Sequence, residues 1–251
     1  MPKGGIRNKR RANKRAGNRM SFAQRVLSVV NSTQETKKAV YETPLIGFDG
    51  SIDLIGDMFR IIPPIAKGDD SWERVGQTIR LMKVVVRGYY AMKVGEASSG
   101  NSRLNVRHFF LKSKQNNDYR DVAAADIAKL LEAPVSSGQP FDGTAQRYMT
   151  PVNREQFTVR GDNKFKMGTN VIYSSTQGNL AETNLSVKYF TKTFSFGKNG
   201  KKIVYEDETT NTPINFPYFH SLGYCKSDGT TLPASDLLQM SYTSTAYYKD
   251  A

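Results

Sequence analysis

Alternation of apolar and polar side chains, with the two-residue period of a β-strand, is the feature that most restricts what this chain can fold into. In residues 185–196, Tyr189 and Thr191 would lie on one face of a strand, and Phe190 and Phe194 on the other. A strand with one apolar face has to bury that face against a second layer. The pattern therefore predicts a protein built from packed β-sheets.

The most apolar long segment of the chain, residues 75–94 (VGQTIRLMKVVVRGYYAMKV), fits the same interpretation. Its three consecutive valines and two adjacent tyrosines favour a strand over a buried helix, because β-branched and aromatic residues pack well on a pleated surface. Gly88 is expected to mark a bulge or a bend. The residues predicted to share one face of this strand are Ile79, Leu81, Val84, Val86 and Tyr89.

The remaining patterns complete an all-β fold with one helical insertion. The segment RDVAAADIAKLLEAP (Arg120–Pro134) is rich in alanine and ends at a proline, which predicts a short helix inserted between strands. The glycines of GKNGKK, residues 197–202, predict a hairpin turn. About eight strands with irregular connections are typical of a Greek-key sandwich, and the predicted fold class is a single eight-stranded jelly roll. Besides residues 75–94, the predicted strands are 39–50, 102–113, 147–168, 184–207 and 237–251.

Positive charge is concentrated at the N-terminus. Residues 1–38 hold eleven lysines and arginines against Glu35 alone, 11 − 1 = +10, so the other 251 − 38 = 213 residues carry only +3 of the formal charge of +13. Such a segment cannot bury enough apolar area to fold alone, and a short amphipathic helix at residues 21–32 is expected to order only by packing. We predict a disordered basic arm, residues 1–38, that binds nucleic acid, and a folded domain, residues 39–251. The candidate nucleic-acid-binding residues are Lys3, Arg7, Lys9, Arg10, Arg11, Lys14, Arg15, Arg19 and Arg25.

Enzyme chemistry finds little support in the sequence. No P-loop, dinucleotide-binding glycine motif, nucleophile elbow or H-E-x-x-H pair occurs. His108 and His220 lie in aromatic surroundings without a nearby carboxylate, and Cys225, the only cysteine, is most simply a packed residue. The acidic segments at 68–70 and 205–209 could bind a cation such as calcium, although such segments are more often solvated loops. No catalytic residue, metal or cofactor is predicted, and no apolar run reaches the roughly 18 to 20 residues needed to insert across a membrane.

Several segments, taken in order, resemble a known family. After the basic arm comes IAKGDDSWERVGQTIRLMKVVVRG (Ile65–Gly88), in which Gly68 is followed by Arg74 and Gly76 at the entry to a strand. The segments PVNREQFTVRGDNKFKMG, KYFTKTFSFGKNGKKIVYED and STAYYKD extend the match over residues 65–250. The chain resembles the capsid proteins of small circular single-stranded DNA viruses that encode a replication initiator, the group that includes circoviruses and geminiviruses.

This resemblance implies a jelly-roll subunit that assembles with itself into an icosahedral shell, the smallest having about 60 copies. The arm would face inward on a single-stranded DNA genome, and the protein would occur in the virion and, during assembly, in the host nucleus. Tyr242, Tyr247 and Tyr248 in the last strand are candidate subunit contacts, because amphipathic aromatics are common at interfaces. The alternatives are the coat protein of a single-stranded RNA virus, with RNA as the cargo, and a cellular basic nucleic-acid-binding module. The arm alone could also be a solubilising segment or a nuclear localisation signal.

A count of charges limits what the arm can do. About 60 arms at +10 supply on the order of 600 positive charges. The gene for this chain alone has 251 × 3 = 753 nucleotides. The arms therefore cannot neutralise even that length of nucleic acid, and basic residues of the body have to contribute. Lys83, Arg87, Lys188 and Lys192 are the candidates.

Overall fold

The computed structural model describes residues 22, 26, 29, 34–52, 57–92, 103–134, 136–168, 170–173, 180–184, 186–227 and 237–250. Internal contacts divide the chain into two compact units, residues 1–34 and 35–251. The helix predicted at residues 21–32 is described at three positions that are helical and exposed, namely Phe22, Val26 and Val29. All of the described strands belong to the second unit, and the first of them begins at Lys37, inside the range predicted for the arm.

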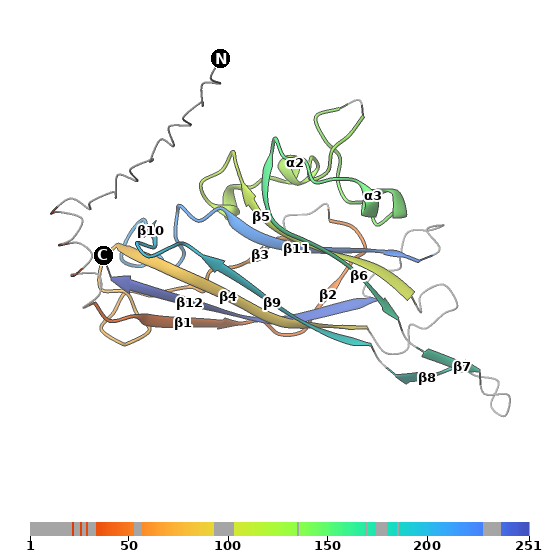
Figure 1. Cartoon of the computed structure of the whole chain (residues 1–251), viewed down its shortest axis with the longest axis horizontal. Coiled ribbons are helices and arrows are strands. Elements are labelled where there is room, and N and C mark those ends of the chain that lie inside the picture. Colours follow the sequence, from red (N-terminus) through yellow and green to blue (C-terminus); the bar gives the residue numbers. More distant parts are fainter. Residues whose placement is uncertain are drawn as a thin grey trace, which may run out of the picture. The chain divides into compact units, whose positions relative to one another are not determined.

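The first sheet is antiparallel and is built around the C-terminal strand (Figure 1). Its members are β1 (Lys37–Glu42), β2 (Ile46–Phe48), β4 (Thr78–Met92), β9 (Val187–Ser195), β10 (Lys201–Val204) and β12 (Leu238–Asp250). Strand β12 lies between β1 and β4, and β2 pairs with one end of it. The other edge of β4 pairs with β9 and β10, which follow each other along it.

The second sheet is also antiparallel and has the order β3-β11-β5-β6. Its strands are β3 (Phe59–Arg60), β5 (Arg103–Ser113), β6 (Phe157–Gly168) and β11 (Tyr218–Lys226). A separate two-stranded hairpin, β7 (Asn170–Tyr173) and β8 (Leu180–Asn184), follows β6. Figure 1 shows the two main sheets as stacked layers.

The chain crosses between these sheets in the order of a jelly roll. After β1 and β2 in the first sheet it passes to β3, returns to β4, crosses to β5 and β6, returns to β9 and β10, and ends through β11 and β12. With β9 and β10 counted as one strand, and the short β2 set aside, the described residues form two four-stranded layers, β1-β12-β4-β9/β10 and β3-β11-β5-β6. Paired Greek keys of this kind define a jelly roll. The predicted eight-stranded jelly-roll sandwich is confirmed.

Alternation along β4 fills the core between the two sheets. The predicted inward residues Ile79, Leu81, Val84 and Val86 are all buried, but Tyr90 rather than Tyr89 continues their face. The side chains from both layers form one continuous apolar cluster. Burial at about 25 cal/mol per Å² of apolar surface makes this cluster the main source of stability.

Of the bulge or bend predicted at Gly88, the bulge is wrong, because the pairing of β4 with β9 and β12 keeps its register there. A Cβ atom at this position would lie 2.5 Å from the Ser241 carbonyl oxygen and 2.7 Å from the Phe190 ring. Glycine is needed here because the neighbouring strands and the Phe190 ring approach the backbone closely. The register of β12 against β4 shifts elsewhere, between Tyr247 and Tyr248.

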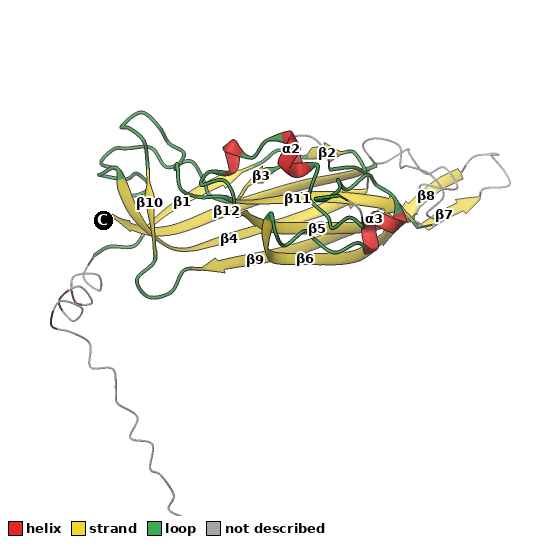
Figure 2. Ribbon diagram, turned by 90° about the horizontal axis from the view of Figure 1, so that it is seen from above, coloured by secondary structure: helices red, strands yellow, loops and turns green. Residues whose placement is uncertain are grey.

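The segment between β5 and β6 forms a layer of its own. It contains η2 (Tyr119–Asp121), α2 (Ala124–Ile127) and α3 (Ala145–Met149). Figures 1 and 2 show these helices on the side of the second sheet that faces away from the first. A second apolar cluster fills the interface, and its members include Ile127, Leu130, Leu131 and Phe141 of the insertion with Phe109, Leu111, Phe157 and Phe219 of the sheet.

The insertion is confirmed, but the predicted helix over Arg120–Pro134 is wrong in extent. Only α2, with four residues, is α-helical there. Leu131 instead forms bridges to Gln139 and Val152. Helix propensity is a weak preference, and here the burial of leucines against the second sheet decides the backbone. The strand predicted from residue 147 begins only at Phe157, after α3, whose N-cap Thr144 accepts a hydrogen bond from the backbone N–H of Arg147.

The hairpin predicted at residues 197–202 is also wrong. Strands β9 and β10 run in the same direction along the same edge of β4. The backbone N–H of Phe196 still donates to the carbonyl oxygen of Met82 (3.0 Å), after which a short loop leaves the edge and rejoins it. Gly197 and Gly200 supply the positive φ angles of 78° and 65° that this loop requires. The glycines mark a loop without a reversal of the chain.

Two aromatic predictions change with the observed register. Tyr242 and Tyr248 are core residues, so their prediction as subunit contacts is wrong, whereas Tyr247 points out of the sheet.

The sequence pattern does not predict strand β11, because nearly all of its residues are buried, on both faces of the strand, and apolar and polar side chains therefore do not alternate along it. One of its faces packs on the first sheet and the other packs under the insertion.

Buried arginines fasten connecting segments to the sandwich. The guanidinium of Arg74 is fully buried over the Tyr205 ring, 4.2 Å from its centroid. It donates to four backbone carbonyls, those of Ile65 (3.3 Å), Gly76 (2.6 Å), Asp207 (2.9 Å) and Thr210 (2.7 Å). Because a buried guanidinium has to be hydrogen-bonded, this residue fixes the loop before β4 against the loop after β10.

Arg107 on β5 does the same for the insertion. It donates two hydrogen bonds of 2.8 Å to the Asp162 carboxylate on β6. Its remaining nitrogen donates to the carbonyl oxygens of Arg147 (3.0 Å), Tyr148 (3.2 Å) and Thr150 (2.6 Å), at the C-terminal end of α3. A cation is favoured there because helix carbonyls are left unpaired at that end.

Between the sheets, a short polar chain crosses the apolar core. Tyr90 is hydrogen-bonded to His108 Nδ1, and His108 Nε2 lies 2.9 Å from His220 Nδ1. Both imidazoles are completely buried, and His220 Nε2 has no hydrogen-bond partner among the described residues. Burial lowers the pKa of His220 to about 3. Burial, together with the charges of His220 and Lys192, also lowers the pKa of His108 well below its usual range.

These histidines should make the fold sensitive to mild acid. Each is neutral in the folded state near pH 6, whereas an unfolded histidine takes up a proton at about pH 6.5, so the unfolded state binds more protons as the pH falls. We expect the free energy of unfolding in urea to decrease from pH 6.5 downward, by up to about 1.4 kcal/mol per pH unit for each histidine. A His220→Phe variant, whose ring can stack on Phe110 as the imidazole does, should show a smaller slope between pH 7 and 5.5. An equal slope in both proteins would contradict this assignment.

Candidate nucleic-acid interface

The described residues cover only part of the predicted binding set. The nine basic residues from Lys3 to Arg25 lie outside them, and their role stays a prediction. The four candidates in the body are described, and they belong to two different surfaces. Lys83 and Arg87 point away from the core on β4, whereas Lys188 and Lys192 lie on the opposite face of β9.

Strand pairing gathers cations from four strands on the outward face of the first sheet. Residues that oppose each other in neighbouring antiparallel strands point to the same side. The observed register therefore places their side chains in rows that cross the sheet. One row is Lys202–Arg80–Lys249, the next is Lys83–Tyr247–Lys38, and Arg87 lies two rows farther along β4, beside Thr243 and Glu42. We call this surface the sheet face.

The sheet face has a strongly positive balance of charge. It holds six cations and one described carboxylate, Glu42, which gives 6 − 1 = +5. None of Lys38, Arg80, Lys83, Arg87 and Lys202 is within 4.0 Å of a described carboxylate. Cations that are not used for internal ion pairs remain available for an anionic ligand.

Aromatic rings, of which Tyr189 is the most exposed, lie on the same face as these cations. Tyr89 and Tyr189 oppose each other across β4 and β9 with ring centroids 6.0 Å apart, and Tyr189 is 78% exposed. The Lys83 ammonium lies 4.3 Å from the centroid of the Tyr247 ring. Proteins that hold single-stranded nucleic acid combine cations for the phosphates with aromatic rings on which bases stack. The sheet face therefore contains both chemical elements of such a surface.

Acidic residues gather instead in the loops around Arg74. Glu208 pairs with Lys67, and the Asp207 carboxylate accepts hydrogen bonds from the N–H groups of Thr209 (2.8 Å) and Thr210 (2.7 Å). These hydrogen bonds, led by that from Thr210, lower the pKa of Asp207. The carboxylate that the sequence offers as a cation ligand thus caps its own turn.

The buried histidines and the cysteine have structural surroundings. His108 and His220 lie on paired strands inside the core, as described above, and Cys225 is buried on β11. Over the described ranges, no group of three or more His, Cys, Asp or Glu side chains is placed to hold a metal ion. In the same part of the chain, no helix combines the length and apolar character that a bilayer span requires.

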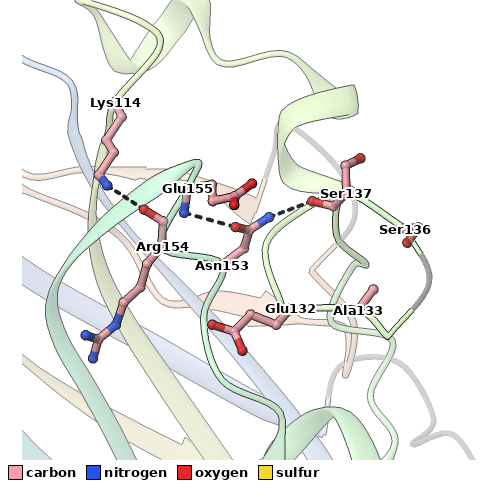
Figure 3. A pocket seen from close by; sticks show the side chains of 8 residues that line it. All are labelled: Lys114, Glu132, Ala133, Ser136, Ser137, Asn153, Arg154 and Glu155. Atoms are coloured by element: carbon pink, nitrogen blue, oxygen red, sulfur yellow. Dashed lines mark hydrogen bonds between the residues drawn. The ribbon is translucent and has the colours of Figure 1, made fainter.

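A polar pocket of about 490 Å³ opens between the insertion and the start of β6 (Figure 3). Much of its lining is tied to the local backbone. Lys114 donates to the carbonyl oxygen of Arg154, and the Asn153 side chain donates to that of Ser137 (2.7 Å) and accepts from Glu155 N–H (3.0 Å). The hydrogen bond from Asn153 holds Ser137 against the segment that precedes β6, so this polar side chain has a structural role in the pocket wall.

Comparisons with known proteins find no matching family model and no matching curated protein. Among solved structures, the chain is similar to one from a full particle of Israeli acute paralysis virus heated to 63 degrees, with 10% identity and a TM-score of 0.29 over 100% of this chain and 79% of that one. It is also similar to one from the native virion of Kashmir bee virus at acidic pH, with 8% identity and a TM-score of 0.26 over 100% and 81% of the two chains. At these TM-scores neither similarity bears on the fold or the function.

Sequence reasoning found two members of the sheet face and missed the others. Lys83 and Arg87 stand out because they interrupt an apolar run, but Lys38, Lys202 and Lys249 belong to distant segments. Only strand register shows that these cations share one surface, and the sequence pattern does not determine register between strands so far apart.

We expect Tyr189→Ala to weaken the binding of a single-stranded oligothymidylate by the full-length chain, by about 1 kcal/mol or more, because base stacking on an exposed ring contributes about 1–3 kcal/mol. Tyr189→Phe keeps the ring and should bind as the unchanged chain does. The measurement is fluorescence anisotropy at fixed salt, with thermal unfolding as a control for the fold. Equal affinity for all three proteins would remove Tyr189 from the interface.

Proposed function

We propose that this chain is the coat subunit of an icosahedral virus of the small circular single-stranded DNA group, related to circoviruses and geminiviruses. The observation that carries the proposal is the combination of a jelly-roll body with an N-terminal segment, residues 1–34, that has nine cations and no acid. Jelly rolls occur in viral capsids, lectins and cupins. A polycationic segment suits the first of these, because a capsid has to hold a polyanion inside it.

The division of charge supports a packaging role for that segment. A packaged single strand has no single conformation, so its ligand should read phosphate charge rather than sequence. Arginine suits this task, because it forms bidentate contacts with phosphates and also stacks on bases. In our proposal the segment at residues 1–34 binds the genome, and the sheet face adds contacts from the body. The protein would reside in the virion and assemble in the host nucleus.

The first test is electron microscopy of the purified full-length chain, followed by typing of the nuclease-protected nucleic acid. We expect closed particles of uniform size, about 60 copies each if the shell is the smallest, because icosahedral symmetry requires at least that number. Protected single-stranded DNA would support the proposed cargo, and exclusive protection of RNA would overturn that part. Monomers or small oligomers at every salt concentration and pH would contradict the capsid proposal and favour a cellular nucleic-acid-binding module.

Removal of residues 1–34 tests the packaging role separately. The deletion should end at residue 34 because β1 begins at Lys37. If the nine cations contact phosphates, the slope of log affinity against log salt for single-stranded DNA should lose about 6, at roughly 0.7 per contact. We expect the shortened chain to self-associate still, which sedimentation would show. An unchanged salt slope would mean that residues 1–34 do not bind the nucleic acid.

A further inference from the structure

A second group of cations lies where the two sheets meet along β9, β10 and β6. We call it the seam. It is distinct from the sheet face, because its lysines on β9 and β10 point to the other side of their strands. Its members are Lys188 and Lys192 of β9, Lys201 of β10, Lys112 of β5 and Arg160 of β6.

Three of the five cations surround one tyrosine of the second sheet, Tyr218 on β11. The side-chain charges of Lys112, Arg160 and Lys201 lie 6.0, 5.6 and 5.6 Å from the centroid of the Tyr218 ring. Arg160 also donates a hydrogen bond of 3.4 Å to the Tyr218 hydroxyl. These residues come from three strands in both sheets, so the fold itself brings the like charges together.

The other two cations continue along the same edge. The Lys188 ammonium lies 4.2 Å from the centroid of the Phe165 ring, and that of Lys192 lies 5.7 Å from the Phe110 centroid. A Cβ atom at Gly161 would lie 3.0 Å from the Lys192 ammonium. The glycine therefore leaves the space through which Lys192 reaches across to β6.

No described carboxylate compensates this charge. None of the five cations is in an ion pair within 4.0 Å among the described residues. Burial, followed by the neighbouring charges of Lys112 and Arg160, lowers the pKa of Lys201. A cluster of like charges that repel one another and lack an internal counter-ion is the arrangement expected for an anion-binding site.

The length of the seam indicates an extended ligand. Lys201 is paired with Leu81 and Lys188 with Tyr90, so nine residues of β4 separate the two ends. At about 3.3 Å per residue this is about 30 Å, which is long enough for several successive phosphates. The Tyr218 and Phe110 rings are buried beneath the cations and are not exposed for stacking on bases. The seam therefore offers cations that contact phosphates, and these two rings offer no surface on which bases can stack.

We propose that the seam binds the sugar–phosphate backbone of single-stranded nucleic acid, as a site separate from the N-terminal segment and the sheet face. The identity of the ligand rests on the proposed function, since the genome is the polyanion that a coat subunit has to hold. The charge balance agrees with this assignment. Residues 1–34 hold nine cations, so about 60 copies supply on the order of 540 charges from that segment and on the order of 300 from the five seam cations, and 540 + 300 = 840 exceeds the 753 nucleotides of the chain's own gene.

Lysine footprinting of the full-length chain tests the seam independently of the arm. The chain is acetylated with and without an oligothymidylate, and the reaction at each lysine is read by mass spectrometry. We expect the oligonucleotide to slow acetylation of Lys188, Lys192 and Lys201 several-fold, and to leave the half-buried Lys129 and the exposed Lys166, which lie outside the seam, unchanged.

Each other outcome overturns the seam proposal. If arm lysines such as Lys3 and Lys9 are protected but seam lysines are not, the arm binds nucleic acid and the seam does not. If particles without nucleic acid give the same protection, the seam is a subunit contact. If heparin protects the seam and the oligonucleotide does not, its ligand is a sulfated polysaccharide. Particle formation by electron microscopy reports on the coat-subunit proposal separately.

Substitution gives a second measurement on the same site. The triple variant Lys188→Gln, Lys192→Gln and Lys201→Gln should reduce the log–log salt slope for the oligothymidylate by about 2, because it removes three phosphate contacts. The matched control, Lys129→Gln, Arg154→Gln and Lys166→Gln, removes the same charge from positions outside the seam and the sheet face and should leave the slope unchanged. Equal slopes in the two triple variants, with both thermal unfolding midpoints preserved, would refute the seam as a phosphate site.

Discussion

The placement of the last strand at the centre of the first sheet is the constraint on which the rest of this structure depends. Strand β12 spans 13 residues and pairs with β1 on one edge and with β4 on the other. The complete first sheet therefore needs residues from Lys37 to Asp250, and its contacts join distant parts of the body. Non-local pairing of this kind is typical of slowly folding β-sandwiches. It also creates the sheet face, because β12 brings Lys249 and Tyr247 beside the cations of β4.

Buried polar groups hold the remaining segments to this frame. Arg74 joins the loop before β4 to the loop after β10 through four carbonyl oxygens, and Arg107 joins β5, β6 and the end of α3. Removing one partner of such a group leaves an unsatisfied charge in the interior, which is far more costly than the loss of a surface ion pair. Arg74, in the segment Ile65–Gly88, thus has a structural role. The cations that remain available for a ligand are those on the strands.

The body is nearly neutral as a whole, but its positive charge is concentrated on particular surfaces. Residues 39–251 carry only +3, yet within this range the sheet face carries 5 − 1 = +4, and none of the five seam cations is within 4.0 Å of a described carboxylate. Acidic loops elsewhere offset these cations, among them the turn at Asp207 and Glu208. Local charge, and not the net charge, determines where a polyanion would be held. A coat subunit benefits from this separation, because one surface has to bind the genome while others contact neighbouring copies.

The sequence by itself determined that the body is a β-sandwich with an insertion, and that positive charge is concentrated before Glu35. Two-residue alternation in β4, β9 and β12 is a local property, so it shows which residues share a face of one strand. The tertiary structure alone decided what lies opposite that face. In the structure, only part of the segment Arg120–Pro134 is helical, and residues Gly197–Lys202 form a loop along one edge and not the expected hairpin. Strand β11 is buried on both faces. The tertiary structure also brought Lys112, Arg160 and Lys201 around Tyr218. The physical reason is that burial and register depend on contacts between residues far apart in the chain, which local periodicity does not specify.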